Sequence, residues 1–348
     1  MSQFVSLRIK EVVQETPEAV SLVFDIPEKD QSNFSFIPGQ FITLKAEING
    51  EEVRRAYSIS SSPKEDLKVS VKKIANGAFS TYANEVLKAG DAIDVMVPEG
   101  KFQLHTNANN PKNYLAFAAG SGITPIMSMI KTVLIEEPES KFFLVFGNRT
   151  AEQAMFFREL LGLQLQHPEQ LFIEFVYSRE QVQGSTYGRI EKPVIEEVVN
   201  TKFKDYSFND YFLCGPEAMI NTVKEVLTAH GAAAEAIHFE LFTTSAPVAE
   251  NTEATGTASI EILVDDEEFT IEADKNTTLL DAALAADIDA PHSCKGGVCC
   301  SCICRVTEGE AHMPNNNLLT DDEIEEGLIL ACMSYAKSDS LKLDFDDA

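Results

Sequence analysis

The sequence predicts a multidomain protein with an N-terminal antiparallel β-barrel, a central α/β domain on a parallel sheet, and a small C-terminal α+β domain. The chain has 348 residues, which is too long for one hydrophobic core. Strand-like segments fill its first third, and strand-like and helix-like runs alternate in the middle. Six of the seven cysteines then lie between Cys294 and Cys332. We place the domains at residues 1–108, 109–242 and 258–348.

The first domain is predicted to be all-β, because apolar and polar residues alternate in short segments separated by Pro-Gly and Asn-Gly turns. Examples are Val20–Phe24, Phe41–Lys45 and Leu67–Val71. This pattern suits a barrel or a sandwich, and we favour the barrel. Alternation along one of its strands should put Arg55 and Tyr57 on one face and Ser58 on the other.

A glycine turn follows in the same domain. Asn76-Gly77-Ala78-Phe79-Ser80-Thr81 precedes a predicted helix over Tyr82–Leu87. A turn with a Ser or Thr cap commonly just starts a helix, but it is also a device that holds a pyrophosphate at a helix N-terminus.

Apolar β-like runs and helical runs take turns over residues 109–242, which predicts a parallel sheet with helices on both faces. The predicted strands are Tyr114–Ala118, Phe142–Phe146, Leu171–Tyr177 and Asp210–Leu213, and the predicted helices are Ile126–Ile135, Ala154–Leu161, Lys192–Val199 and Glu217–His230. Such sheets bind ligands outside the carboxyl ends of their strands. Four conspicuous stretches fall there: Ala119–Pro125, Gly147–Thr150, Ser178–Glu180 and Cys214–Pro216.

Two of these stretches indicate a nucleotide. Gly120 and Gly122 follow the first strand and lead into a helix, where a dinucleotide pyrophosphate would lie. Ser178 and Arg179 follow a later strand, and a hydroxyl beside a guanidinium suits a 2′-phosphate. Each signal is weak alone, and the coincidence of all four stretches at strand ends carries the prediction.

Residues 243–257 hold no large apolar side chain except Val248, so they are predicted to form a flexible linker. The last domain, residues 258–348, begins with two β runs and a helix. They lie at Ile260–Val264, Phe269–Ile271 and Thr278–Ala286. This order predicts a compact α+β fold.

Four cysteines have the C-x4-C-x2-C…C spacing of a plant-type [2Fe-2S] cluster, in which two iron ions need four thiolates. The set that fits is Cys294, Cys299, Cys302 and Cys332. A zinc site would normally show paired C-x2-C units, and disulfides would need an oxidising compartment. Buried thiols without a metal are the remaining alternative.

The loop between these cysteines also suits a cluster. Gly296 and Gly297 would supply positive φ angles and close backbone approach, so that N–H groups can donate to the sulfurs. Cys300 and Cys304 fall outside the ligand spacing, and we expect them to be small packing residues.

The formal net charge is −27, which argues against a nucleic-acid partner because phosphate contacts need a basic surface. Residues 261–348 hold 21 Asp and Glu against 5 Lys and Arg, a net charge of −16. This balance is either a solvated face or a surface that steers docking to a basic protein. The sequence shows no signal peptide and no apolar run long enough to span a membrane, so we expect a cytoplasmic protein.

Taken together, the motifs resemble the ferredoxin-NADP reductase family. In chain order they are Arg55-Ala-Tyr-Ser, Gly77-Ala-Phe-Ser, Gly120-Ser-Gly-Ile-Thr-Pro, Ser178-Arg-Glu and Cys214-Gly-Pro. The C-terminal part resembles plant-type ferredoxins, which implies a β-grasp fold. The fused order, with Ile237–Phe242 before the linker and the loop Cys294–Cys299, is similar to the reductase components of bacterial oxygenases.

The resemblance implies roles in the first domain. Tyr57 would stack on the isoalloxazine of FAD, Ser58 would hydrogen-bond near flavin N5, and Arg55 would pair with the FAD pyrophosphate. The residues that would hold the same pyrophosphate are Gly77, Phe79 and Ser80. FMN could replace FAD, but Arg55 with the helix-start motif favours FAD.

It also implies roles in the second domain. The residues that would line the nicotinamide nucleotide are Gly120, Gly122, Thr124, Pro125, Cys214, Gly215 and Pro216. Glu240 would approach the reactive edge of the flavin, although it could also be a surface carboxylate. Ser178 and Arg179 match family members that select the 2′-phosphate, and Arg149 could add a second positive charge, so we favour NADPH over NADH.

The implied function is an electron-transfer reductase with Ser58, Cys214 and Glu240 as catalytic residues. Electrons would pass from NADPH through FAD and the [2Fe-2S] cluster to an oxygenase, and we expect a di-iron enzyme of aromatic degradation. Two alternatives stay open: a free-standing reductase for other oxygenases, hydroxylases or desaturases, and a redox-sensing cluster protein.

Overall fold

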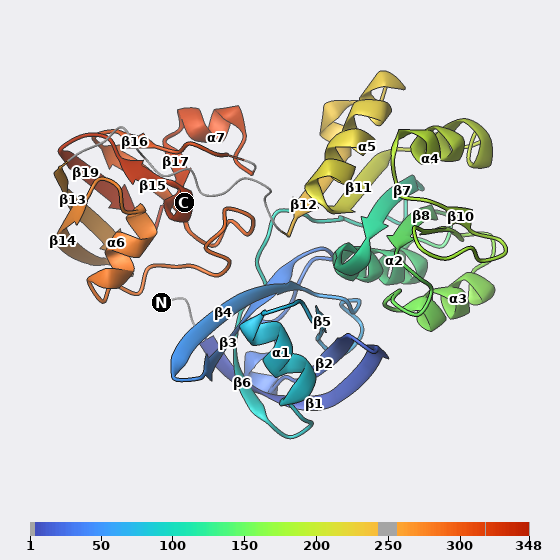
Figure 1. The fold of residues 1–348 in the computed structure, drawn as a ribbon, viewed down its shortest axis with the longest axis horizontal. Coiled ribbons are helices and arrows are strands. Elements are labelled where there is room, and N and C mark those ends of the chain that lie inside the picture. Colours follow the sequence, from blue (N-terminus) through green and yellow to red (C-terminus); the bar gives the residue numbers. More distant parts are fainter. Residues whose placement is uncertain (1–3, 243–255, 317, 348) are drawn as a thin grey trace. The chain divides into compact units, whose positions relative to one another are not determined.

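The computed structural model describes residues 4–242, 256–316 and 318–347 (Figure 1). The predicted linker therefore lies outside the described residues up to position 255. Phe4–Val53 and Tyr57–Phe242 belong to one compact unit with two sheets, and the C-terminal sheet belongs to a second unit. Because the first two sheets share a unit, the boundary at 108/109 stays a prediction.

The N-terminal sheet is antiparallel, as predicted, with its strands in the order β4-β3-β6-β1-β2-β5. The strands are β1 (Phe4–Thr16), β2 (Ala19–Asp25), β3 (Phe41–Ile48), β4 (Glu51–Ser58), β5 (Lys68–Lys72) and β6 (Ala92–Met96), with the short helix η1 (Glu28–Asp30) after β2. Side chains from different strands, such as Leu22, Ile42 and Val95, are fully buried in one core. The predicted strands Val20–Phe24, Phe41–Lys45 and Leu67–Val71 correspond to β2, β3 and β5.

The prediction of a closed barrel is corrected to an open sheet. β4 and β5 are the edges of the strand order, and within the described residues one isolated bridge, Ile59↔Val69, links the segment after β4 to β5. Beyond this bridge the Ser60 N–H donates to the Lys68 carbonyl at 2.8 Å, while the Lys68 N–H donates to the Ser61 hydroxyl at 3.0 Å. Pro63 follows and has no N–H for a ladder.

Helix α1 (Ala78–Glu85) begins four residues before the predicted start. Gly77 is its N-cap and no side chain caps it, so the expected Ser or Thr cap is wrong. A Cβ at Gly77 would lie 2.4 Å from the Ser80 hydroxyl and 2.5 Å from Ile74, which explains the glycine.

The central sheet is parallel, in the order β10-β9-β8-β7-β11-β12. Its strands are β7 (Asn113–Ala119), β8 (Lys141–Asn148), β9 (Leu171–Tyr177), β10 (Thr186–Tyr187), β11 (Asp210–Gly215) and β12 (Ile237–Leu241). The helical segments are η2 (Gly120–Gly122), α2 (Ile123–Glu136), α3 (Phe157–Gln166), α4 (Lys192–Glu197), η3 (Val198–Lys202), α5 (Glu217–Ala229) and η4 (Ala234–Ala236). Figure 1 shows α2 and α3 on one face of the sheet and α4 and α5 on the other, as predicted.

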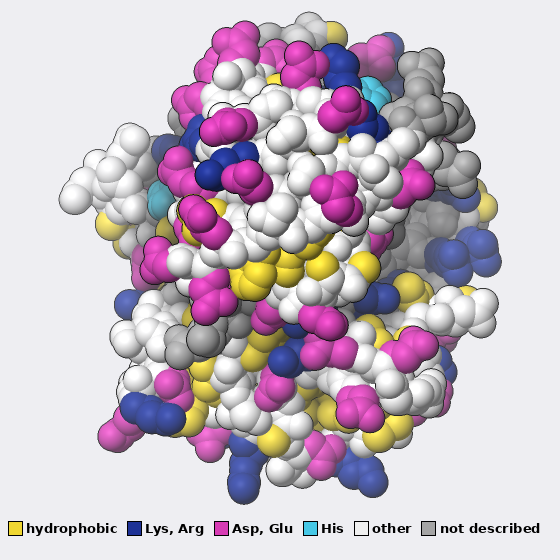
Figure 2. All heavy atoms as spheres, turned by 90° about the vertical axis from the view of Figure 1, so that its left-hand side faces the viewer, with side chains coloured by type: hydrophobic (Ala, Val, Ile, Leu, Met, Phe, Trp, Pro, Cys, Tyr) yellow, Lys and Arg dark blue, Asp and Glu magenta, His cyan; other side chains and the backbone are white. Residues whose placement is uncertain are grey.

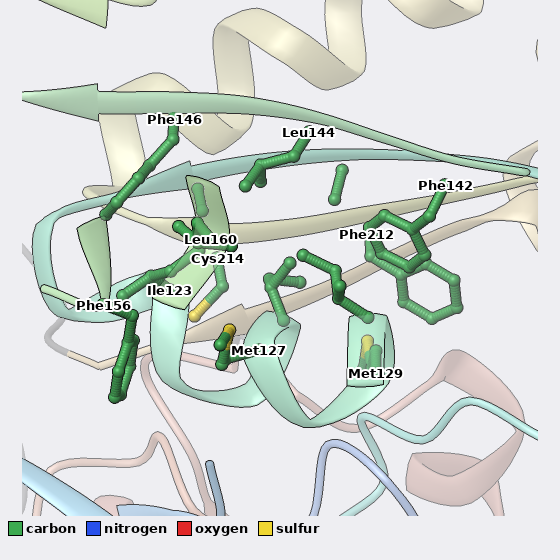
Figure 3. Close-up of a cluster of buried hydrophobic side chains, with 14 of the residues drawn as sticks. Ile123, Met127, Met129, Phe142, Leu144, Phe146, Phe156, Leu160, Phe212 and Cys214 are labelled. Atoms are coloured by element: carbon green, nitrogen blue, oxygen red, sulfur yellow. The ribbon is translucent and has the colours of Figure 1, made fainter. Parts of the chain in front are cut away.

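Apolar side chains fill the space between this sheet and helices α2 and α3. Figure 3 shows Phe142 and Leu144 of β8 facing Ile123 and Met127 of α2, and all four are fully buried. Helix α3 begins at Phe157 and not at Ala154, because Phe156 adopts a left-handed backbone with φ of 58°.

The C-terminal unit has the predicted α+β fold, with a five-stranded sheet in the order β14-β13-β19-β15-β17. Its strands are β13 (Thr257–Val264), β14 (Glu267–Asp274), β15 (Ile303–Glu308), β16 (Ala311–His312), β17 (Leu328–Leu330), β18 (Tyr335–Ala336) and β19 (Ser340–Asp344). The helices are α6 (Leu279–Ala285), α7 (Asp321–Glu325) and η5 (Ala331–Met333). Cys304 is fully buried in its core, as expected for a packing residue.

Across the described residues, no helix is both long and apolar enough to cross a membrane.

Candidate cofactor sites

Two residues predicted in separate motifs meet in one buried neighbourhood. Ser58, the last residue of β4, donates from its hydroxyl to Oε2 of Glu240 in β12 at 3.3 Å, and both side chains are buried. β12 pairs with β11 so that Cys214 stands beside Glu240. The end of β4 therefore lies against the carboxyl ends of β11 and β12.

Cys214 contributes a neutral thiol to this neighbourhood. Its side chain is fully buried and points toward α2 near Met127 (Figure 3). Burial, reinforced by the Glu240 carboxylate, raises the pKa of the Cys214 thiol well above its ordinary value. The thiol therefore stays protonated near neutral pH, and it is poorly suited to act as a nucleophile.

The glycines of the second domain allow a close approach of backbone segments. A Cβ at Gly122 would lie 2.1 Å from the Cys214 carbonyl oxygen, so only glycine fits where the β7 turn passes the end of β11. Gly120 has φ of +56°. Thr124 donates to the Ser121 carbonyl at 3.0 Å in the first turn of α2, where Pro125 needs no N–H partner. Backbone N–H groups at this helix start suit a pyrophosphate.

The region around β11 ends in a second helix start. Gly215 closes β11, and a Cβ there would lie 2.8 Å from the Met219 side chain. Pro216 then caps α5. Cys214, Gly215 and Pro216 thus form one strand-to-helix turn beside the β7 turn, as their predicted shared role requires.

The two aromatic residues of the predicted flavin motifs lie side by side. The rings of Tyr57 in β4 and Phe79 in α1 have centroids 5.5 Å apart, tilted by 41°. Ser80 fixes the start of α1, because its hydroxyl donates to the Gly77 carbonyl at 3.3 Å. Arg55 is exposed on β4, and its guanidinium donates to the Arg54 carbonyl at 2.7 Å. Phe79 is buried and Tyr57 is partly exposed, so the Tyr57 ring, supported by Phe79 next to a helix start, suits a flavin and its phosphates.

The predicted 2′-phosphate residues are adjacent. The Arg179 N–H donates to the Arg149 carbonyl at 2.9 Å, and the Ser178 N–H donates to the Asn148 carbonyl at 3.0 Å. Both arginines thus follow neighbouring strands, β8 and β9, at the same edge of the sheet. Two arginines whose backbones are hydrogen-bonded to each other suit a phosphate.

Lys72, at the end of β5, is a further cation that the sequence analysis missed. Its ammonium lies 3.9 Å from the position of a Cβ at Gly120. Burial lowers the pKa of Lys72, the charge of Arg149 lowers it further, and Glu18 only partly compensates. A half-buried lysine beside a second cation favours an anion such as a pyrophosphate. Its position at the end of an apolar strand was visible in the sequence, but nothing there indicated that it faces Gly120.

The four predicted cluster ligands form two pairs in the C-terminal unit. The Cys294 thiol is hydrogen-bonded to the Cys299 thiol, and the Cys302 thiol to the Cys332 thiol. Among the described residues, no three His, Cys, Asp or Glu side chains are arranged to hold a single metal ion. Four thiols in two pairs meet the ligand requirement of a cluster of two iron ions.

The loop supplies N–H donors to the sulfurs, as predicted. Gly296 and Val298 donate to Sγ of Cys294 at 3.3 and 3.5 Å. The Cys299 thiol and these N–H groups outweigh burial and lower the pKa of Cys294 to about 7. The glycine prediction is half right: Gly297 has φ of +67° and a Cβ there would meet Met333 at 2.7 Å, while Gly296 has no positive φ.

Three known protein families match successive parts of this chain. The FAD-binding domain of oxidoreductases matches residues 6–104, the NAD-binding domain of oxidoreductases matches residues 117–225, and the 2Fe-2S iron-sulfur cluster binding domain matches residues 262–337. One component of 1,2-phenylacetyl-CoA epoxidase from Escherichia coli is 38% identical over 99% of both chains. The chain belongs to the family of FAD- and [2Fe-2S]-containing oxygenase reductases.

Other proteins are less similar to this chain in sequence. The ferredoxin reductase component of 3-ketosteroid-9-alpha-monooxygenase from Rhodococcus rhodochrous is 33% identical over 99% of this chain and 97% of its own. Among solved structures, phthalate dioxygenase reductase has a TM-score of 0.61 and 26% identity, and the match covers 98% of each chain. A type IV self-sufficient cytochrome P450 monooxygenase has a TM-score of 0.70 at 22% identity, and this chain spans 41% of it, so that likeness shows the fold alone.

The predicted resemblance is confirmed, including the likeness to the reductase component of phenylacetyl-CoA epoxidase that Ile237–Phe242 and the cysteine loop suggested. The protein is an oxidoreductase with FAD, NAD and [2Fe-2S] domains. The roles of the individual residues remain predictions.

Proposed function

We propose that this reductase carries electrons from NADPH through FAD and a [2Fe-2S] cluster to the oxygenase component of a di-iron phenylacetyl-CoA epoxidase. The likeness to an epoxidase component over the full length of both chains supports the choice of acceptor. The buried contact between Ser58 and Glu240 carries the proposal for the chemistry, because it brings the flavin motif to the ends of β11 and β12.

Tyr57 would hold the isoalloxazine of FAD, with the Phe79 ring packed next to it. When bound, FAD would supply a hydride acceptor at N5 and the means to pass the two electrons singly to the cluster. The Ser58 hydroxyl would lie near that nitrogen with its oxygen as an acceptor, because its one proton is donated to Glu240. Glu240 holds this hydroxyl in position through its carboxylate. The neutral Cys214 thiol and the turn that follows would keep water away from the nicotinamide.

The coenzyme would be held by its phosphates. Gly120 would leave room for the pyrophosphate just before α2, with Lys72 beside it, and Gly122 lets this turn pass close to the Cys214 carbonyl. Arg149, Ser178 and Arg179 would bind the 2′-phosphate at the ends of β8 and β9, which favours NADPH over NADH. Four reduced thiols as cluster ligands favour the cytoplasm as the location.

The same geometry allows an alternative, in which the protein transfers electrons to other oxygenases, hydroxylases or desaturases. The comparisons include reductases of a ketosteroid monooxygenase and of a glycine betaine monooxygenase. Transfer to the purified epoxidase, compared with transfer to an unrelated di-iron oxygenase, distinguishes the two.

A Cys332→Ser variant tests the order of the cofactors. We expect loss of the cluster's electron paramagnetic resonance signal in the reduced protein, while NADPH-driven ferricyanide reduction stays within about twofold, because that reaction needs only the flavin half. Cys300→Ser is the matched control and should keep both the signal and the activity. Loss of ferricyanide reduction together with the cluster signal in the Cys332→Ser variant would contradict the proposal that the flavin half works without the cluster. If the wild-type protein reduces ferricyanide with NADPH but shows no cluster signal, electrons would have to leave from the flavin and not through a cluster.

A further inference from the structure

Helix α2 carries a polar stripe in a position where a core helix is normally apolar. Thr124, Ser128 and Lys131 are spaced i, i+4 and i+7, so they lie on one face of the helix. Their exposed fractions are 2%, 0% and 5%. Other positions on the helix, such as Ile123 and Met127, pack on the parallel sheet (Figure 3). A buried lysine is costly unless it is paired, so the stripe requires polar partners on the structure that covers it.

The partners come from the loop that follows the flavin motif. The Ser128 hydroxyl donates to the Ser61 carbonyl at 2.6 Å. The Lys131 ammonium donates to Oε1 of Glu65 at 3.1 Å. The other oxygen of Glu65 accepts the Ser62 N–H at 2.7 Å, so the carboxylate also shapes the loop. The stripe is therefore tied to both ends of the loop Ser61–Glu65, which begins three residues after Ser58.

Lys131 also joins this loop to helix α3 of the second domain. Its ammonium contacts Glu159 of α3, and Lys68 of β5 lies 3.7 Å from the other oxygen of Glu159. Two lysines and two glutamates thus alternate in sign across the seam between the two sheets. Only 6% of the Lys131 side chain is exposed, against 42% for Glu65 and 35% for Glu159, so the lysine is the buried centre of the network.

Next to the stripe, the seam is packed tightly. Gly39, in the turn before β3, has φ of +101°, and a Cβ there would lie 2.6 Å from the Met129 methyl group and 1.9 Å from the Phe102 carbonyl oxygen. Met129 neighbours Ser128 on α2. A shift of α2 along the loop Ser61–Glu65 would therefore break apolar packing as well as the ion pairs. The contacts thus favour one position of α2 relative to this loop.

We propose that Lys131 is a positioning residue for hydride transfer: by binding Glu65 and Glu159 together, it fixes α2 against the loop after Ser58. The start of α2 carries Gly120–Thr124, so this contact sets the distance between the nicotinamide site and the flavin site. The proposal rests on the proposed function, because it needs coenzyme and flavin at those two ends. A misplacement of about 1 Å at reacting atoms can cost about 10²-fold in rate.

The test compares Lys131→Met with the wild-type holoenzyme under anaerobic conditions. Stopped-flow absorbance measures flavin reduction by NADPH and by NADPH deuterated at the transferred position. We expect the rate constant at saturating coenzyme to fall about 10- to 100-fold, with an undiminished isotope effect and a coenzyme Kd within about threefold. Hydrogen exchange of amides 60–66 should rise in the same variant, which reports the loosened loop without any turnover.

Two further variants complete the design. Lys131→Arg keeps the charge and should restore most of the rate. Lys64→Met is the matched control, because Lys64 joins the same loop to the same helix through an exposed ion pair with Glu136 at 3.7 Å, and such pairs contribute little. Its rate should stay within about twofold of the wild type. If Lys131→Met does not fold, Ser128→Ala takes its place with the same expected split between rate and Kd.

A folded Lys131→Met protein with the wild-type rate and unchanged exchange overturns the proposal, as does an equal loss in the Lys64→Met variant. A fall in coenzyme affinity with an unchanged rate constant also overturns it, since that would make Lys131 a binding residue. Failure of the proposed function has a different signature, because the wild-type protein itself would then show no flavin reduction by NADPH.

Discussion

The Ser58 hydroxyl lies 3.3 Å from the Glu240 carboxylate, although 182 positions separate the two residues in the chain. Both side chains are buried, and neither belongs to the sheet that holds the other. The contact joins the end of an edge strand of the first sheet to the last strand of the second. It therefore offers a direct test of whether the two residues act as one unit.

Glu240→Gln should slow flavin reduction by NADPH about 10- to 100-fold, because the amide cannot hold the Ser58 hydroxyl as a charged acceptor does. Ser58→Ala should have an effect of similar size. If the two act through one hydrogen bond, the double variant should be no slower than the slower single variant. Multiplicative losses, measured by stopped-flow absorbance, would show that they act independently.

Arg179→Ala should reduce the efficiency of NADPH and leave NADH nearly unchanged. A charge-assisted hydrogen bond contributes about 1.5–3 kcal/mol, so kcat/KM for NADPH should fall by roughly one to two orders of magnitude. Equal losses with both coenzymes would contradict the assignment to the 2′-phosphate.

Lys72→Met should weaken the binding of both coenzymes alike, because its ammonium lies near Gly120, where the pyrophosphate common to both is expected. We expect KM for NADPH and for NADH to rise together, by about tenfold. Lys73→Met is the matched control, since the Lys73 ammonium pairs with Glu85 on an exposed surface. A loss confined to NADPH would move Lys72 to the 2′-phosphate site.

The Glu65 carboxylate should make stability depend on pH on the acid side. Burial alone would raise its pKa, but the Ser62 N–H and the Lys131 ammonium outweigh burial and hold the pKa below the ordinary value of 4.5. A lowered folded-state pKa means that the stabilisation is fully present above about pH 4.5 and is lost as the pH falls through the folded-state value. Because Glu65 is partly exposed, the effect should not exceed about 1 kcal/mol.

Denaturant unfolding monitored by flavin fluorescence between pH 3 and pH 7 measures this dependence. Glu65→Gln should be less stable than the wild type at pH 7, and the difference should disappear at the acid end. A difference that is constant across this range would show that the Glu65 charge makes no contribution.

Local sequence patterns predicted the sheets, the strand-end motifs and the cluster ligands, because each depends on residues close together in the chain. The polar stripe Thr124, Ser128 and Lys131 was also visible as an i, i+4, i+7 pattern. Its partners were not, since Ser61 lies 67 positions and Glu65 lies 66 positions from the residue it contacts. Lys72 was missed for the same reason: a strand pattern shows that a side chain alternates, but not which distant backbone it faces.

Two predictions failed because the sequence pattern does not contain the deciding information. Phe156 was placed inside a helix because its neighbours are apolar with a helical period, but it adopts a left-handed φ that the pattern does not reveal. Closure of the barrel depends on whether the edge strands β4 and β5 pair, and within the described residues one isolated bridge, Ile59↔Val69, links the segment after β4 to β5. A period-2 pattern identifies a strand but does not show which edges pair.

The acidic balance of the C-terminal unit leads to the last prediction. Each of the five Lys and Arg side chains in residues 261–348 forms an ion pair with a carboxylate of the same unit. The pairs are Lys275–Asp339, Lys295–Asp281, Arg305–Asp347, Lys337–Glu310 and Lys342–Glu261. Asp and Glu side chains are spread over the face of the molecule that Figure 2 shows. The net charge of −16 is therefore available to attract a basic surface on the acceptor.

If this charge guides docking, electron transfer from the reductase to its oxygenase should slow as salt is raised through about 0.1 M, where the Debye length is about 10 Å. Transfer from flavin to cluster within the chain should respond much less, because the covalent connection already supplies a high effective concentration. Stopped-flow absorbance of both steps over one salt series, with the same protein preparation, provides the internal control. A rate of electron transfer to the oxygenase that does not change with ionic strength would contradict this proposal and leave the acidic surface with a solubilising role only. The reason is that salt screens the attraction between exposed charges that lie farther apart than the Debye length.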